Sequence, residues 1–254
     1  MIYFASDFHL GVDGRLSSEE RERLIVQWLD DIKDKAKIIY LVGDIFGFWF
    51  EYKTVIPKGY MRLQAKWVEL IDRGIRIELF TGNHDMWMFD YFTEELGIPV
   101  HRKPIEREHG GKKFLIGHGD GLGPGDHGYK RIKKVFANPL AQRLFGLIPP
   151  GIGMRIAQFW SGKSRDHNRE ARHFLGAKDE WLVQYCERCI GRKPYDYLIF
   201  GHRHLPIDYT LGNGTSRYIN LGEWISAQSF AHFDGNELSL EFYKNPEGSI
   251  YGKD

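Results

Sequence analysis

The sequence predicts an α/β fold in which polar motifs lie at the carboxyl ends of buried strands. Five runs of apolar, mostly β-forming residues occur along the chain, and each precedes a short motif containing Asp, Asn or His. We expect these strands at Ile2 to Ala5, Lys37 to Val42, Ile75 to Phe80, Lys113 to Ile116 and Tyr197 to Phe200. Because ligands bind at the carboxyl ends of strands in open α/β sheets, we expect the motifs to share one cleft.

Two amphipathic helices are expected to connect the first three strands. Glu20 to Lys35 places its apolar residues at helical intervals on one side. Met61 to Arg73 repeats this pattern, and Gly74 follows it as a helix stop. The N-terminal half therefore has a βαβ order.

After Gly201 the pattern changes to short strands separated by turns that contain Gly and Asn. We predict antiparallel strands at Ile207 to Leu211, Arg217 to Leu221, Ser226 to Phe233 and Glu237 to Tyr243. The residues from Asn245 onward are expected to form a frayed tail.

A different composition marks an insertion near residues 129–172, where apolar and cationic residues alternate. Pro149-Pro150-Gly151 divides this stretch into at least two predicted helices. One interpretation is a pair of amphipathic helices that cover the core and expose a solvated basic face. The other is a cap whose apolar side holds acyl chains and whose cations meet phosphates or an anionic membrane surface. Residues Phe46 to Phe50 should border the same cleft, although any of these rings can belong to the core.

The motif side chains supply carboxylate, amide oxygen and imidazole groups. They are Asp7, His9, Asp44, Asn83, His118, His202 and His204. This set suits Mn²⁺, Fe or Zn²⁺ and lacks the thiolates of a structural zinc site. Seven ligands are too many for one ion, so we predict two divalent metal ions, with Mn²⁺ as the first choice. If Asp44 bridges, the sets are Asp7, His9, Asp44 and His204 for one ion, and Asp44, Asn83, His118 and His202 for the other.

Each motif taken alone has an ordinary structural explanation. Asp-x-His after a strand occurs by chance, and a single His is more often a hydrogen-bonded structural residue than a ligand. Gly43-Asp44 also fits a common turn. Five such motifs in succession, all with metal-binding side chains, favour the metal site.

The order D-x-H, G-D, G-N-H-D, G-H and G-H-x-H resembles the calcineurin-like metallophosphoesterases, over residues from Met1 to about Phe233. The resemblance implies two central β-sheets packed face to face with helices outside, and in-line attack of water on phosphorus. It also implies catalytic roles for Asp44 and for His84, which assists the leaving group in that superfamily.

Shorter segments resemble a narrower family, the bacterial UDP-2,3-diacylglucosamine diphosphatases of lipid A synthesis. They are Gly117 to Leu122 with Asp126 and Tyr129, then Asn138-Pro139-Leu140, and Leu221-Gly222-Glu223-Trp224. This resemblance implies cleavage of UDP-2,3-diacylglucosamine to UMP and 2,3-diacylglucosamine 1-phosphate. We expect substrate contacts from Asn83, Asp126, Tyr129 and Lys163; for the last three, helix capping or surface solvation is an equal alternative.

One position departs from the narrower family, which has Arg where this chain has His84. This difference leaves open another metallophosphoesterase activity, such as that of a nucleotide phosphodiesterase or phosphatase. A non-catalytic interaction protein on the same fold is a further alternative. The presence of every expected metal ligand argues against it.

Composition limits the function classes. With 254 residues, the chain is expected to form a single domain over residues 1–254 that includes the insertion. A net charge of +1 argues against a nucleic-acid partner. The first strand starts at Ile2, so we expect no signal peptide, and no apolar run is long enough to span a membrane. We therefore expect a cytoplasmic enzyme, peripheral to the cytoplasmic face of the bacterial inner membrane because its substrate is a lipid. The oligomeric state is left open.

Overall fold

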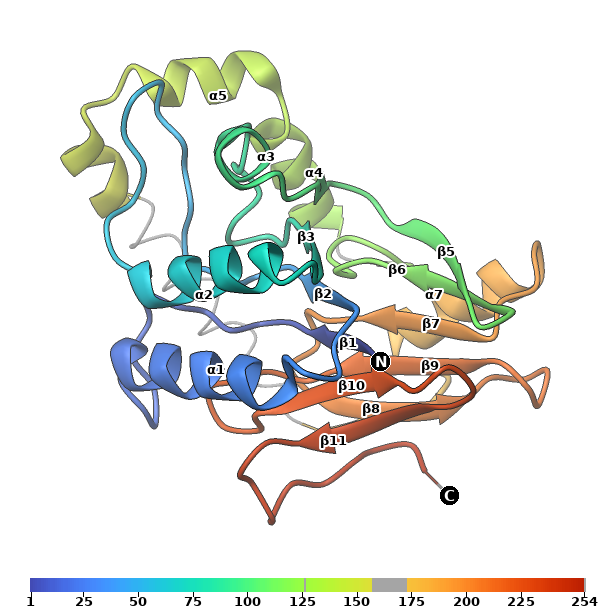
Figure 1. The fold of residues 1–254 in the computed structure, drawn as a ribbon. Helices are drawn as coiled ribbons and strands as arrows, with labels where there is room; N and C mark the ends of the chain where they lie inside the picture. Colours follow the sequence, from blue (N-terminus) through green and yellow to red (C-terminus); the bar gives the residue numbers. More distant parts are fainter. Residues whose placement is uncertain (126, 157–172, 254) are drawn as a thin grey trace.

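Two β-sheets form the centre of the computed structural model, which describes residues 1–125, 127–156 and 173–253 (Figure 1). The six-stranded sheet contains, in spatial order, β11 (Leu238–Phe242), β10 (Ser229–Phe233), β1 (Ile2–Ala5), β2 (Ile38–Val42), β3 (Arg76–Phe80) and β4 (Val100–His101). The five-stranded sheet contains β5 (Ile105–His109), β6 (Lys112–Ile116), β7 (Tyr197–Phe200), β9 (Arg217–Leu221) and β8 (Pro206–Thr210). The predicted α/β fold with two central sheets is confirmed.

The sheets pack face to face through a layer of buried rings and aliphatic side chains. Phe4 of β1 stacks on Tyr40 of β2 at 5.2 Å between ring centroids and on Phe114 of β6 at 6.0 Å. In each sheet the strands that precede the motifs run parallel: β1, β2 and β3 in one, and β6 and β7 in the other. Their carboxyl ends therefore open toward the same side of the sandwich.

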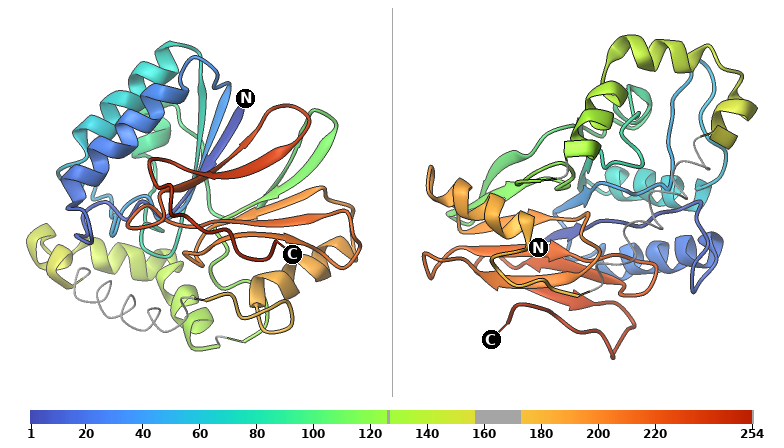
Figure 2. Two further views of the ribbon diagram at one scale, coloured as in Figure 1. Left: turned by 90° about the horizontal axis from the view of Figure 1, so that it is seen from below. Right: turned by 180° about the vertical axis from the view of Figure 1, so that it is seen from behind.

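Helices cover the outer faces of both sheets. α1 (Ser18–Ile32) and α2 (Met61–Asp72) lie side by side against the six-stranded sheet, and α7 (Trp181–Ile190) lies against the other (Figure 2). Ser17 and Glu20 form a capping box at the start of α1. α2 has no such cap of its own; instead Glu22 of α1 accepts its Leu63 N–H at 3.0 Å. Among the described residues, no helix combines the length and apolarity needed to cross a bilayer.

The insertion contains α4 (His127–Phe136), α5 (Pro139–Gly146) and a helical stretch at residues 150–156. The predicted break at the prolines is confirmed between α5 and residue 150, and a further break falls at Asn138, which caps α5. We call residues 127–156 the cap. Trp87 attaches it by donating its Nε1–H to Phe136 O at 2.7 Å and by packing its ring against Phe145. Phe46, Trp49 and Phe50 are buried in the core.

The prediction of a frayed tail from Asn245 onward is wrong. Tyr251 forms a β-bridge with Ile207 of β8. Tyr251 O accepts the N–H of Asp208, and Tyr251 N–H donates to Pro206 O, each at 2.9 Å. β8 is an edge strand with unpaired backbone groups, and the tail satisfies them. Three short elements were also missed: β4, β5 and the six-residue α3 (Tyr91–Leu96).

Candidate metal centre

The seven predicted ligands lie together at the carboxyl ends of strands from both sheets. Asp7 and His9 follow β1, Asp44 follows β2, Asn83 follows β3, His118 follows β6, and His202 and His204 follow β7. Two groups have ligand atoms within 4.8 Å of one another: Asp7, His9, Asp44 and His204, and Asp44, His118 and His202. Asp44 belongs to both groups, as a bridging ligand requires.

The first group has the spacing of a single coordination sphere. His9 Nε2 lies 3.0 Å from His204 Nε2 and 3.6 Å from Asp7 Oδ1, and His204 Nε2 lies 3.1 Å from that oxygen. Ligands about 2.1 Å from one ion are roughly 3.0–3.5 Å apart at tetrahedral or octahedral angles. Asp44 Oδ2 lies slightly further away, at 3.9 Å from His9 Nε2.

The second group surrounds His118. Its Nε2 lies 3.3 Å from Asp44 Oδ2 and 3.3 Å from Asn83 Oδ1. On the other side of the ring, Nδ1 lies 2.9 Å from the carbonyl oxygen of Val42. A proton on Nδ1 donated to that carbonyl leaves the Nε2 lone pair free for a metal, which is the usual support of a histidine ligand. The His202 ring lies 5.2 Å from that of His118.

Two buried carboxylate oxygens show that this centre fits a cation. Asp7 Oδ2 accepts the N–H of His202 at 3.0 Å, and Asp44 Oδ1 accepts the N–H of His84 at 2.8 Å. The remaining oxygens, Asp7 Oδ1 and Asp44 Oδ2, are buried and face imidazole nitrogens of the other candidate ligands, but among the described residues neither has a partner with hydrogen-bond geometry. Buried oxygens without donors are costly, and metal coordination is the ordinary way to satisfy them.

The charges in the centre favour added positive charge. Burial alone would raise the pKa of Asp7, but the adjacent His204 and His9 hold that pKa well below its usual value. Burial would likewise lower the pKa of His118, yet Asp44 raises it to about 10. Burial, followed by the charge of His118, lowers the pKa of His202 to about 4. The carboxylates of Asp7 and Asp44 therefore stay ionised, and their negative charge would favour a cation bound between them.

Five of the seven predicted ligands have left-handed backbone conformations. Their φ angles are 56° at Asp7, 47° at His9, 53° at Asp44, 68° at His202 and 56° at His204. Such conformations cost non-glycine residues about 1–3 kcal/mol and persist where the surroundings impose them. Hydrogen bonds between the loops impose them here: Asp7 N–H donates to Gly43 O, and His9 N–H donates to Asp44 O, each at 3.0 Å. A Cβ at Gly82 would lie 2.1 Å from Asp44 Oδ1, so this motif glycine is required.

The predicted catalytic and substrate-contact residues lie beside this centre where the structure describes them. The His84 ring stands edge-on to His9, 5.1 Å between centroids. The Tyr129 ring is 6.4 Å from His202, and its hydroxyl donates to Asp120 Oδ2 at 2.5 Å. Asp126 and Lys163 lie outside the described residues.

Four residues that support the centre were not predicted from the sequence: Asp120, Lys133, Asp85 and Arg21. Asp120 Oδ2 accepts the hydroxyl of Tyr129 and lies 2.6 Å from Lys133 Nζ. Asp120 occurred in a segment noted only for its resemblance, and Lys133 in a segment noted only for its charges. Asp85 accepts backbone N–H groups from two motif loops, and its place in Gly82-Asn83-His84-Asp85 was the available signal. Arg21 is fully buried in α1 and donates to the carbonyl oxygens of Phe8 and His9, each at 2.8 Å. A helical Arg is normally solvated, so nothing in the sequence marked it.

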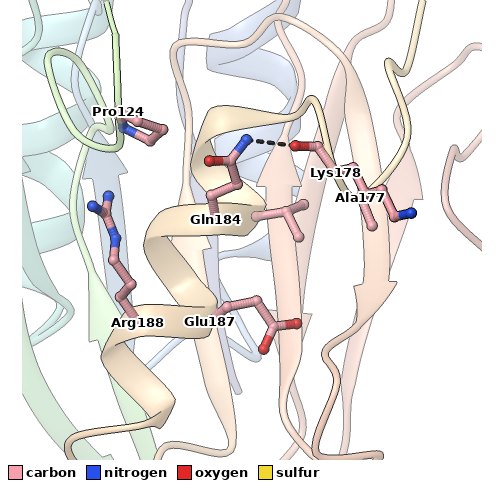
Figure 3. Close-up of a pocket in the computed structure, with 7 residues that line it drawn as sticks. Pro124, Ala177, Lys178, Gln184, Glu187 and Arg188 are labelled. Carbon is pink, nitrogen blue, oxygen red and sulfur yellow. Dashed lines mark hydrogen bonds between the residues drawn. The ribbon is translucent and has the colours of Figure 1, made fainter.

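A pocket of about 420 Å³ lies beside α7 (Figure 3). Its described lining includes Pro124, Lys178, Gln184, Glu187 and Arg188. The Glu187 carboxylate accepts the N–H of Gly212 at 2.7 Å, and none of the lining residues is a predicted metal ligand. We assign the chemistry to the metal centre and not to this pocket.

Comparison with known proteins agrees with the geometry. The calcineurin-like phosphoesterase family model matches residues 1–206. A UDP-2,3-diacylglucosamine hydrolase of Porphyromonas gingivalis is 39% identical, over 97% of this chain and 98% of its own. Another protein of that name, from Yersinia pseudotuberculosis, is 28% identical over 93% of this chain and 96% of its own. The chain belongs to the calcineurin-like phosphoesterase family and is a metal-dependent hydrolase.

Proposed function

We propose that this protein hydrolyses the phosphoanhydride of UDP-2,3-diacylglucosamine to UMP and 2,3-diacylglucosamine 1-phosphate. The observation that supports hydrolysis is the double group of donors that shares Asp44. The substrate is proposed from the relative of that name, which is 39% identical to nearly the whole chain. The single domain with a helical insertion is part of the same proposal.

We propose the ligand division given by the two groups. Asp7, His9, Asp44 and His204 hold one ion, and Asp44, Asn83, His118 and His202 hold the other. Asp44 Oδ2 faces His118 Nε2 at 3.3 Å and His9 Nε2 at 3.9 Å, which supports the bridging role. Oxygen and imidazole donors without thiolate suit Mn²⁺, with Fe or Zn²⁺ as alternatives.

The protein's own groups orient the reaction. When bound, the ions polarise the phosphoryl oxygens and lower the pKa of water. Asn83 is held beside His118 and can donate its amide N–H to a phosphoryl oxygen. His84 lies within the same opening, 9% exposed, where it can bind the bridging or leaving oxygen. Tyr129 is placed at the cap side of the centre by Asp120.

The cap supplies apolar surface for a lipid. Exposed apolar side chains are concentrated there, at Ile132, Val135, Leu140, Leu144, Leu147, Ile152 and Ile156. A hollow of about 420 Å³ between α4 and α5 is lined by Val135, Leu140 and Leu144, with Lys134 at its side. We propose that this surface holds acyl chains and brings a cytoplasmic enzyme to the inner face of the bacterial inner membrane.

A nucleotide phosphodiesterase or phosphatase is the second candidate, and His84 is the residue that favours it. Its imidazole can act as a proton donor to a poor leaving group, which an Arg cannot. A non-catalytic protein is disfavoured because all seven donors are present and grouped.

Metal and product analysis of the purified protein tests the proposal. We expect two Mn²⁺ per chain, one after His202→Ala, and inactivity after Asp44→Ala. With UDP-2,3-diacylglucosamine, the products should be UMP and 2,3-diacylglucosamine 1-phosphate. Faster hydrolysis of simple nucleotide diesters would select the second candidate, and a metal-free, inactive wild-type protein would overturn both.

A further inference from the structure

Arg203 separates the two histidines of the loop after β7, and its side chain takes a different direction from theirs. His202 and His204 contact the carboxylates and rings of the metal centre. Arg203 is 5% exposed and contacts the residues around the start of α7. We infer that Arg203 is a positioning residue, which fixes the loop of His202 and His204 to α7 through Glu180. This inference rests on the proposed function, because it concerns the metal site.

The first connection is an ion pair. Arg203 Nε donates to Glu180 Oε1 at 2.7 Å, and the side chains are 3% and 0% exposed. Glu180 precedes α7, whose Leu182 packs against Gly119 in the loop after β6. The anchor is therefore a helix packed on the same sheet. Breaking one half of a buried pair leaves an uncompensated charge, so the pair holds its geometry strongly.

The same guanidinium makes two further connections to described residues. It donates Nη2–H to His173 O at 2.9 Å, and its Cζ lies 5.1 Å from the centre of the Trp181 ring. His173 begins the described segment that follows the cap in the chain. Arg203 thus joins the histidine loop, this segment and α7 with one planar group, which the fork of a guanidinium permits and an ammonium does not.

The loop needs such support because of its backbone. His202 and His204 both have positive φ, at 68° and 56°, which is unfavourable for residues with a Cβ. Gly201 O accepts Arg203 N–H at 2.8 Å and the Asn220 side chain at 2.5 Å, which fixes the first half of the loop. The Arg203 side chain fixes the second half. Without it, His204 can leave the left-handed conformation that aims its ring at Asp7.

An ordinary structural ion pair is the alternative, and the chain contains a matched control. Arg217 of β9 binds Asp208 of β8 with Nε to Oδ1 at 2.9 Å and Nη2 to Oδ2 at 2.6 Å. This pair lies in the same sheet, but neither residue belongs to a predicted ligand motif. A variant of Arg217 therefore reports the cost of losing a structural pair alone.

The experiment measures Mn²⁺ affinity by calorimetry and thermal unfolding of the metal-free protein for each variant. Arg203→Met and the double variant Arg203→Met with Glu180→Gln should bind Mn²⁺ about 10-fold or more weakly, the usual effect of losing a ligand's support. Arg203→Lys should recover thermal stability, since it keeps the charge opposite Glu180, but not affinity. Arg217→Met should lower the unfolding temperature and keep Mn²⁺ affinity within about twofold.

The outcomes distinguish a failure of this inference from a failure of the proposed function. If Arg203→Met, the double variant and Arg203→Lys all keep wild-type Mn²⁺ affinity, the positioning role is wrong while the proposed function stands. If Arg203→Met does not fold, the Lys and double variants decide in the same way. If the wild-type protein binds no Mn²⁺ and hydrolyses nothing, the proposed function fails and this inference fails with it.

Discussion

The carboxylate of Asp85 accepts the backbone N–H of Asp44, so one motif holds the central residue of another in place. Asp85 Oδ1 lies 3.3 Å from Asp44 N and 2.7 Å from Gly82 N, and Oδ2 lies 2.7 Å from Ile45 N. Asp85 is fully buried, and burial, followed by the charge of Asp44, raises its pKa to about 7. These bonds join the loop after β2 with the loop after β3, which carry Asp44 and Asn83.

Asp85→Asn should weaken metal binding without removing any ligand. An amide has one acceptor oxygen, and its NH₂ group would face backbone donors, leaving buried N–H groups unsatisfied at about 1–3 kcal/mol each. We expect Mn²⁺ affinity to fall about 10- to 100-fold, measured by calorimetry. Asp90→Asn is the control, because Asp90 is exposed and makes no capping bond with its side chain. Unchanged Mn²⁺ affinity in Asp85→Asn would show that the loops hold their geometry without this carboxylate.

The grouping of the candidate ligands could be predicted from the sequence because the information for it is local. Asp7, Asp44 and His202 each follow a buried strand within three residues, so the strand fixes where each side chain begins. These strands are continuous apolar runs buried on both faces, so the first polar residue after each run marks where the strand ends. Parallel strands then place all the loops at one end of the sandwich, with no knowledge of the contacts between them.

The supporting residues could not be predicted in this way. Arg21 donates to His9 O across 12 positions, and Glu180 pairs with Arg203 across 23. A buried Arg or Glu has no local mark in the sequence that separates it from a solvated one. The tail was missed for the same reason, because the edge of β8 that Tyr251 covers is a product of the tertiary fold.

Leu144→Asp should affect lipid substrates alone. Leu144 is 57% exposed on α5, so a carboxylate there should not disturb the core. If the cap binds acyl chains, the KM for UDP-2,3-diacylglucosamine should rise at least about 10-fold, while the KM for a short soluble diester stays unchanged. Met61→Asp, at a residue 78% exposed on α2, is the control. Equal changes for both substrates would contradict acyl-chain binding by the cap.

Glu78→Gln should reduce the acid sensitivity of the fold. Glu78 is buried in β3, and Arg76, His101 and Arg107 lie 2.6, 2.7 and 3.0 Å from its carboxylate. Burial would raise the pKa of Glu78, but these partners, His101 first, hold it below the usual value. A carboxyl whose pKa is lower in the folded than in the unfolded protein stabilises the fold at pH values above the unfolded pKa of about 4.3. This stability is lost as the pH falls through the folded-state pKa.

Urea unfolding of wild type and Glu78→Gln at pH 7 and pH 3.5 measures this effect. We expect the variant to be about 1–3 kcal/mol less stable at pH 7, because the charge-assisted bonds between the buried Glu78 carboxylate and its partners are lost. The difference should shrink at pH 3.5. A difference that stays constant with pH would show that the ionisation of Glu78 does not contribute.

His84→Arg separates the two candidate functions. The N–H that His84 donates to Asp44 Oδ1, at 2.8 Å, belongs to the backbone, so the substitution should keep two Mn²⁺ per chain. A sugar 1-phosphate has a second pKa of about 6 and leaves with little protonation, so charge and hydrogen bonding from Arg suffice. An alkoxide leaving group needs a proton, which a guanidinium does not give up near neutral pH, so its loss should cost about 10²-fold or more in rate.

We therefore expect the variant to keep most hydrolysis of UDP-2,3-diacylglucosamine and to lose activity on alkyl phosphodiesters. UMP release and metal content should be measured on the same samples. A variant that binds both ions but no longer cleaves the UDP-lipid would show that the natural reaction depends on proton transfer from His84, as a nucleotide phosphodiesterase requires.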